Sequence, residues 1–343
     1  MKLSILDQSP RSAGKTEQQA LQESVRLAQA GEELGYTRYW IAEHHDMSGL
    51  TCPAPEVMLA YIGAQTSKIR IGSGEILLPH YKPYKVAEVF NLLSVLFPNR
   101  IDLGIGRAPG GPAEATIALS GNFLEQVRQL PGKFKELLQF LYHEFPAEHM
   151  YTNISPTPLP VVSPEPWLLG TSEKSAILAA ETGVAYVFGH FMSEKDGEQL
   201  MNTYKNTFTA TARLKQPKTI IAVAAICAET TEQAEELALS GAAWRLQLAN
   251  GEGGSGIPPI EEAKKYIGSK HQDVMEGVQK KTVIGNPQEV KQQLLEIQAR
   301  YKADEIMIVT TVHSFEDRIA SYRLIANEIL MEENCYDYNS DVK

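Results

Sequence analysis

Eight short apolar segments alternate with segments of helical periodicity along this chain of 343 residues. The apolar segments are continuous runs of branched and aromatic residues, which is typical of parallel strands buried on both faces. Eight such segments in one long domain favour a (β/α)8 TIM barrel over an open doubly wound α/β sheet. Residues 1–343 are therefore predicted to form a single domain. The predicted strands are residues 2–6, 39–42, 69–78, 100–105, 167–170, 184–188, 219–227 and 304–309.

Two connections are longer than a barrel requires, and they follow the fourth and seventh predicted strands. A long helix over residues 122–145, interrupted at Pro131-Gly132, precedes a Pro-, Thr- and Ser-rich loop at residues 146–166. The second insertion covers residues 249–283 and begins with the sequence NGEGGSG, which is the most flexible segment of the chain by composition. Both insertions are expected on the catalytic face.

Composition excludes several classes of function. The formal net charge is −10 and the pI is near 5.4, with Lys and Arg scattered along the chain, which argues against a nucleic-acid surface. No segment approaches the roughly 20 apolar residues that cross a bilayer. The sequence MKLSILDQSP is typical of a first strand rather than a secretory signal, and three cysteines without regular spacing predict neither disulfides nor a zinc site. We expect a soluble, cytoplasmic protein.

Five of the eight histidines directly follow a predicted strand. Loops after barrel strands converge on one mouth, so these side chains could share a pocket, although histidines are also common at polar strand ends. The adjacent pair could suggest a metal site, but neighbouring residues of an extended chain point to opposite sides, and a single imidazole near a cofactor is favoured. The five residues are His44, His45, His80, His190 and His313.

Two further segments are typical of anion binding. Gly104-Ile105-Gly106 ends the fourth predicted strand and delivers Arg107, a natural anchor for a phosphate or a planar anionic ring. A dinucleotide fingerprint fails here because Pro109 stands at the third glycine position and no helix begins there. Residues 170–175, GTSEKS, follow a strand and open a helix, which suits a phosphate, although a simple helix cap is the alternative.

Gly74-Glu75 lies where the third predicted strand meets its turn. Glycine within a strand marks a bulge or a close approach by a ligand or another backbone. The sharper hypothesis is a strained backbone, including a non-proline cis peptide, that supports a flat ring.

These segments together resemble the bacterial luciferase-like, flavin-dependent monooxygenases, and in particular their alkanal-monooxygenase-like branch. The resemblance covers nearly the whole chain and is most specific over residues 40–111. It is carried by AEHH (42–45), GSGEILLP (72–79), GIGR (104–107), GTS with Ser175 (170–175), IGNP (284–287) and EIMIVT (305–310).

The resemblance implies a barrel that binds reduced FMN and uses it with O2 to oxidise a small organic substrate. A separate NAD(P)H:flavin reductase would supply the reduced flavin. By the same resemblance His44 is the catalytic histidine, Arg107 contacts the flavin, and Gly74–Glu75 matches a cis peptide beneath its ring. Ser172 and Ser175 match phosphate-side hydroxyls. Gly170 and Thr171 complete the predicted cofactor site. The predicted substrate pocket is formed by His45, His80, His190 and His313.

The chain departs from the family pattern at one position, and several alternative functions remain open. Luciferases carry a reactive cysteine where this chain has Gly106. This difference implies that the chain does not emit light and oxidises a different substrate. The insertion at residues 249–283 occupies the place of the family's mobile lid, and the family's pairing of barrels implies a homodimer. A deazaflavin- or flavin-dependent reductase or dehydrogenase of the same superfamily, a non-catalytic flavin-binding protein and a metal-dependent barrel hydrolase remain alternatives.

Overall fold

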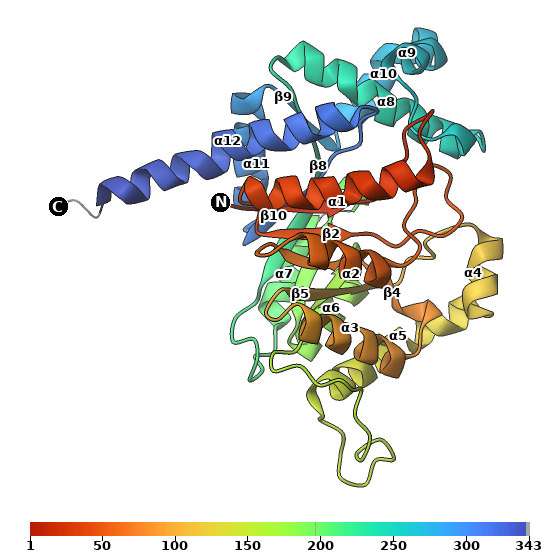
Figure 1. The fold of residues 1–343 in the computed structure, drawn as a ribbon, viewed down its shortest axis with the longest axis vertical. Coiled ribbons are helices and arrows are strands. Elements are labelled where there is room, and N and C mark those ends of the chain that lie inside the picture. The colour runs from red at the N-terminus through yellow and green to blue at the C-terminus, as the bar shows by residue number, and fades with distance from the viewer. Residues whose placement is uncertain (196, 341–343) are drawn as a thin grey trace.

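Eight parallel strand positions close into a barrel in the computed structural model, which describes residues 1–195 and 197–340 (Figure 1). Strand β10 pairs with both β1 and β8, and these pairings close the sheet. The predicted (β/α)8 barrel is confirmed. The barrel strands are β1 (Lys2–Asp7), β2 (Arg38–Ile41), β3 (Arg70–Ser73), β5 (Ile101–Gly106), β6 (Glu165–Gly170), β7 (Ala185–Gly189), β8 (Thr219–Cys227) and β10 (Glu305–Val309).

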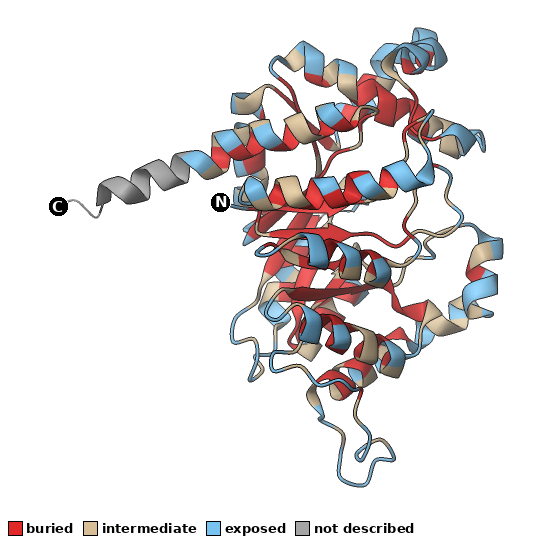
Figure 2. Cartoon of the chain, in the orientation of Figure 1, coloured by how far each residue is buried: buried red, intermediate tan, exposed pale blue. Residues whose placement is uncertain are grey.

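Helices surround the strands and bury one face each, as the red stripes in Figure 2 show. Local signals start several of them: Thr16 forms a capping box with Gln19 at the start of α1, and Asn286 forms one with Glu289 before α11. The helices are α1 (Glu17–Glu33), α2 (Pro55–Gln65), α3 (Pro83–Leu96), α4 (Ala113–Ser120), α5 (Phe123–Tyr142), α6 (Glu173–Thr182), α7 (Gly197–Thr207), α8 (Thr231–Ala249), α9 (Ile260–Ile267), α10 (His271–Gln279), α11 (Pro287–Tyr301) and α12 (Phe315–Ser340).

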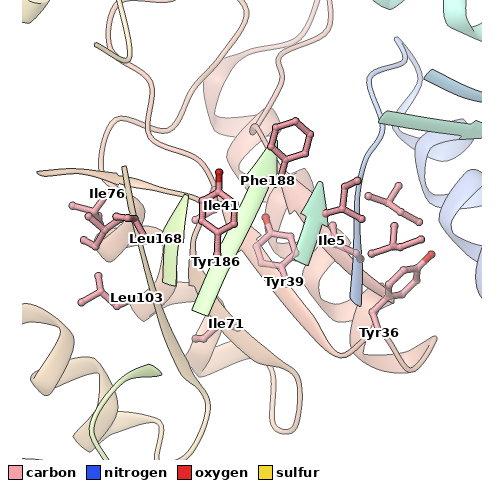
Figure 3. Close-up of a cluster of buried hydrophobic side chains, with 14 of the residues drawn as sticks. Ile5, Tyr36, Tyr39, Ile41, Ile71, Ile76, Leu103, Leu168, Tyr186 and Phe188 are labelled. Carbon is pink, nitrogen blue, oxygen red and sulfur yellow. The ribbon is translucent and has the colours of Figure 1, made fainter. Parts of the chain in front are cut away.

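In the barrel strands other than β3 and β5, alternate residues belong to two apolar layers. Trp40 and Met307 point into the barrel, whereas the residues on either side of them, such as Tyr39 and Ile41, pack outward against the helices. Figure 3 shows part of the outer layer, including Tyr39, Ile41, Leu168 and Tyr186. Because both faces are buried, the strands carry apolar runs rather than an alternating pattern, and this explains why the sequence indicated them.

Buried charges close the barrel at the amino ends of its strands. Arg38 of β2 donates to Asp102 of β5 (Nη1 to Oδ2, 2.9 Å) and to Glu305 of β10 (Nε to Oε1, 2.8 Å). Trp40 Nε1 and Arg70 also donate to Asp102. The three central charges are almost completely buried, so each depends on the others for its compensation.

The third predicted strand, residues 69–78, is wrong as one continuous strand. Strand β3 ends at Ser73, and β4 (Ile76–Leu77) pairs with β5 after a break. The Gly74–Glu75 peptide between them is cis. The glycine at position 72 has a packing reason, since a Cβ there would lie 2.6 Å from Trp40 Nε1.

The predicted interruption at Pro131-Gly132 is also wrong, because α5 continues through Pro131. Proline inside a helix removes one hydrogen bond and costs about 3 kcal/mol. The helix nevertheless buries Leu130, Phe134 and Leu137 on one face, and this burial offsets the cost.

The glycine-rich insertion is largely helical. After the 3-10 turn η3 (Gly253–Ser255), α9 and α10 pack beside α8, and the short strand β9 (Thr282–Gly285) pairs in parallel with the carboxyl-terminal half of β8. Figure 1 shows α8, α9 and α10 together at one end of the molecule. The function of this insertion as a mobile lid stays a prediction. The single domain over residues 1–343 also stays a prediction, and it includes residues 196 and 341–343, which lie outside the described residues. None of the described helices has both the length and the apolar composition to cross a membrane.

Candidate active site

A cavity of about 320 Å³ lies at the carboxyl ends of the barrel strands. Its floor is apolar and includes Ala222 of β8 and Met307 of β10, two inward-facing core residues. The loops after the strands bring predicted site residues to its wall. These are His44, Gly74, Glu75, Arg107, Gly170 and Thr171.

His44 follows β2 and is anchored through its backbone, whose N–H donates to the Cys52 carbonyl oxygen at 2.9 Å. Burial, with a smaller contribution from the neighbouring His45, lowers the pKa of the His44 imidazole to about 4. The ring is therefore neutral near pH 7 and can accept a proton or a hydrogen bond. Its Nδ1 atom is buried and has no hydrogen-bond partner among the described residues.

Glu43 organises the wall behind His44, and the sequence analysis missed it. Its fully buried carboxylate accepts hydrogen bonds from His45 Nε2 (2.7 Å), Tyr81 Oη (2.9 Å) and the Leu77 backbone N–H (3.0 Å). Glu43 thus joins the loop after β2 to β4 and the segment that follows. The available signal was a charged residue at the end of a buried apolar strand, because such a residue needs partners.

Glu75 places a second carboxyl group at this cavity. Burial, assisted by the charge of Glu43, raises the pKa of Glu75 to about 8, although backbone N–H groups of Arg107 and Ala108 donate to the carboxyl and oppose the rise. The group is therefore largely protonated at neutral pH and can donate a hydrogen bond.

Arg107 approaches the amino end of α6. Its Nη2 donates to Ser172 Oγ at 2.8 Å, and Ser172 caps the helix in a capping box with Ser175. The guanidinium forms no salt bridge with the described residues. A positive charge beside a helix amino end, with two hydroxyls nearby, favours an anion. Ser175 is buried and also donates to the Ser172 carbonyl oxygen at 2.6 Å, so the cap and the anion site use the same residues.

The other four histidines are not among the residues that line this cavity. His45 binds Glu43 and packs edge-on against His80, with ring centroids 5.7 Å apart. His80 Nε2 contacts the Pro109 carbonyl oxygen at 3.0 Å, and His313 Nδ1 contacts that of Ile257 at 2.9 Å. His190 packs against Tyr301, and burial lowers its pKa. Their assignment to a substrate pocket stays a prediction.

Residues 1–302 match the family model of the luciferase-like monooxygenases. The chain belongs to this family. It is 44% identical to the uncharacterized protein YceB of Bacillus subtilis, with 96% of this chain and 99% of the relative covered. It is 37% identical to the N-acetyl-S-alkylcysteine monooxygenase of the same organism, with 96% and 98% covered. Apo-MsnO8 has a similar structure, with a TM-score of 0.87, 33% identity and coverage of 95% and 97%.

More distant structures share the fold and bind flavin-type cofactors. The oxygenating component of 3,6-diketocamphane monooxygenase from Pseudomonas putida, solved with FMN, has a TM-score of 0.69 at 18% identity and covers 96% of this chain and 98% of its own. An F420-dependent secondary alcohol dehydrogenase has a TM-score of 0.67 at 13% identity, with 96% and 98% covered. At these identities the likeness establishes the fold alone.

Proposed function

We propose that this protein is an FMN-dependent monooxygenase that receives reduced flavin from a separate NAD(P)H:flavin reductase. Together with O2, the bound reduced flavin supplies the chemistry of oxygen activation and insertion into a small organic substrate. The observation that carries the proposal is the convergence of His44, Arg107 and the amino end of α6 on one cavity with an apolar floor.

The residues present fit a phosphorylated flavin. Arg107 and Ser172 would hold the phosphate side, where a positive guanidinium meets the helix amino end. The apolar floor with Met307 suits the flat ring, and His44 Nδ1 lacks the partner that a buried polar atom requires.

The chain's own groups would then handle protons and water. His44, neutral near pH 7, would accept or hold a proton beside the reacting atoms, while Glu43 keeps His45 in place behind it. The apolar floor would exclude water from the reaction.

The name of the N-acetyl-S-alkylcysteine monooxygenase supports thioethers of N-acetylcysteine as the first substrates to test. We further propose a homodimer. The supporting observation is a set of large apolar side chains that remain exposed on neighbouring helices α2 and α3. They are Val57, Tyr61, Leu92, Val95 and Leu96.

The deciding experiment is a titration of the purified protein with oxidised FMN, reduced FMN and F420, followed by oxygen-consumption assays with a flavin reductase present. Tight binding of reduced FMN that is lost in Arg107→Met, together with substrate oxidation, is the expected result. Binding of F420 in place of FMN would overturn the monooxygenase proposal and favour a dehydrogenase. FMN binding without turnover of any substrate would favour a non-catalytic flavin protein.

A further inference from the structure

A second cavity, of about 670 Å³, adjoins the first and shares Gln8, His44, Phe191 and Met192 with it. The strands show how the two are stacked. Strand β8 contributes Ala222 to the first cavity and Ala224 to the second, and β10 contributes Met307 and then Val309. Same-face residues two positions apart are about 7 Å apart along a strand, so the second cavity lies nearer the mouth of the barrel.

The second cavity combines an apolar wall with a positively charged side. Leu50, Trp244 and Val309 belong to the apolar part. Its lining cations are Arg245 in the carboxyl-terminal half of α8, Lys270 and Lys281, and its one lining carboxylate among the described residues is Asp273. Lys281 is already paired with Glu194, which leaves Arg245 and Lys270 to set the charge of the chamber.

Arg245, like Lys270, lines this chamber without an ion pair among the described residues. Its guanidinium has no hydrogen bond, ion pair or ring contact with the described residues. The residue is exposed to solvent overall, and partial desolvation beside the cavity wall lowers the pKa of the guanidinium. A partly desolvated guanidinium in a mainly apolar chamber gains most from a carboxylate, which it can bind in bidentate geometry.

We propose that this second cavity is the substrate chamber and that Arg245 selects substrates bearing a carboxylate on an apolar body. This inference rests on the proposed function, because it places the substrate next to the cavity assigned to the flavin. His44, which lines both chambers, would stand between the two bound molecules. The apolar wall would hold the group to be oxidised, and Arg245 would fix the opposite end.

The test uses calorimetry on the full-length protein without flavin. The probes are 4-phenylbutyrate, decanoate and N-acetyl-S-benzylcysteine, each compared with its uncharged carboxamide. We expect the carboxylates to bind at least tenfold more tightly than their amides in the wild type. Arg245→Met should remove that preference, whereas Arg245→Lys should keep part of it because a cation remains.

Arg107→Met is the matched control, because it removes a cation from the other cavity and should leave the carboxylate preference intact. Loss of the preference in Arg107→Met, with Arg245→Met unchanged, would overturn the inference by locating the carboxylate site in the flavin cavity. Equal binding of acids and amides, or no binding of any carboxylate, would also overturn it. Because no flavin is present, failure of the FMN titration would be distinguishable from these outcomes.

Discussion

The carboxyl group of Glu75 occupies the space that any side chain at position 106 would need. An ideal Cβ on Gly106 would lie 1.7 Å from Glu75 Cδ and 1.9 Å from each carboxyl oxygen. The backbone at Gly106 imposes no positive φ, so the glycine is required by its neighbour and not by its own conformation. At position 106, where luciferases carry a reactive cysteine, the space for a side chain is thus filled by an acid from the break between the neighbouring strands β3 and β4.

This relationship predicts a strong coupling between the two positions. Gly106→Ala should destabilise the protein by about 1–3 kcal/mol, since it overfills a packed site. Glu75→Gly should rescue most of that loss in the double variant, which urea unfolding of the four proteins would measure. Gly132→Ala is the control, because a Cβ there meets nothing within 4 Å. Additive effects of the two substitutions would contradict the steric explanation.

The raised pKa of Glu75 predicts a pH dependence of stability. Its value rises from an ordinary 4.5 to about 8, so the folded state binds this proton more tightly than the unfolded state. Its stabilising contribution is complete below about pH 4.5 and is lost as the pH rises through about 8, with a slope of up to about 1.4 kcal/mol per pH unit. The difference in unfolding free energy between wild type and Glu75→Gln should follow this trend. A pH-independent difference would contradict it.

His44 should dominate catalysis and titrate at an unusually low pH. His44→Ala should lower substrate turnover by roughly 10²–10⁴-fold, as expected for the loss of a general acid or base. Because the pKa of His44 is lowered to about 4, its imidazole should stay neutral between pH 8 and 5. Its titration should therefore not reduce wild-type turnover in that range. Steady-state assays with a reductase would measure the turnover of His44→Ala and the pH dependence of wild-type turnover. His271→Ala, at an exposed position, is the control. Unchanged turnover in His44→Ala would remove the residue from the mechanism.

The buried charges at the amino ends of the strands predict a large loss of stability in Arg38→Met. Removing the cation leaves Asp102 and Glu305 buried without compensation, a situation that costs about 3–5 kcal/mol. Lys85→Met, which breaks an exposed pair with Glu88, should cost about 1 kcal/mol or less. Thermal and urea unfolding would compare the two. Equal, small losses would show that the buried network relaxes.

The exposed apolar side chains predict that a single charge would dissociate the proposed dimer. Leu96→Glu on α3 should shift the protein from dimer to monomer in sedimentation velocity runs. Leu124→Glu on α5, where the side chain is 73% exposed, should leave the dimer intact. A wild type that sediments as a monomer at micromolar concentration would exclude the dimer itself.

The barrel and part of its site could be predicted because both depend on local sequence. Apolar runs identify buried strands, and the carboxyl ends of parallel strands meet at one face, which brings His44 and Arg107 to one cavity although they lie on different strands. The helix cap at Ser172 could likewise be predicted from the sequence, since Ser-x-x-Ser at the start of a helix satisfies the free backbone N–H groups.

The parts that could not be predicted depend on contacts between distant segments. The role of Glu43 depends on its hydrogen bonds with Tyr81 and Leu77, which are distant from it in the sequence. Pro131 looks like a helix break until the burial of its helix is known. Arg245 looks like one exposed residue of α8 until the fold places it over the second cavity. In each case tertiary packing overrides the local signal.

The stacking of the two chambers has a kinetic consequence. The barrel is sealed at the amino ends of its strands by Arg38 and its carboxylates, and the second cavity lies between the first and the mouth. A molecule that fills the outer chamber therefore stands in the way of one that must reach the inner chamber. On the proposed assignment of the two chambers, we expect sequential binding. The occupant of the inner chamber should enter first and leave last, and excess substrate should slow turnover.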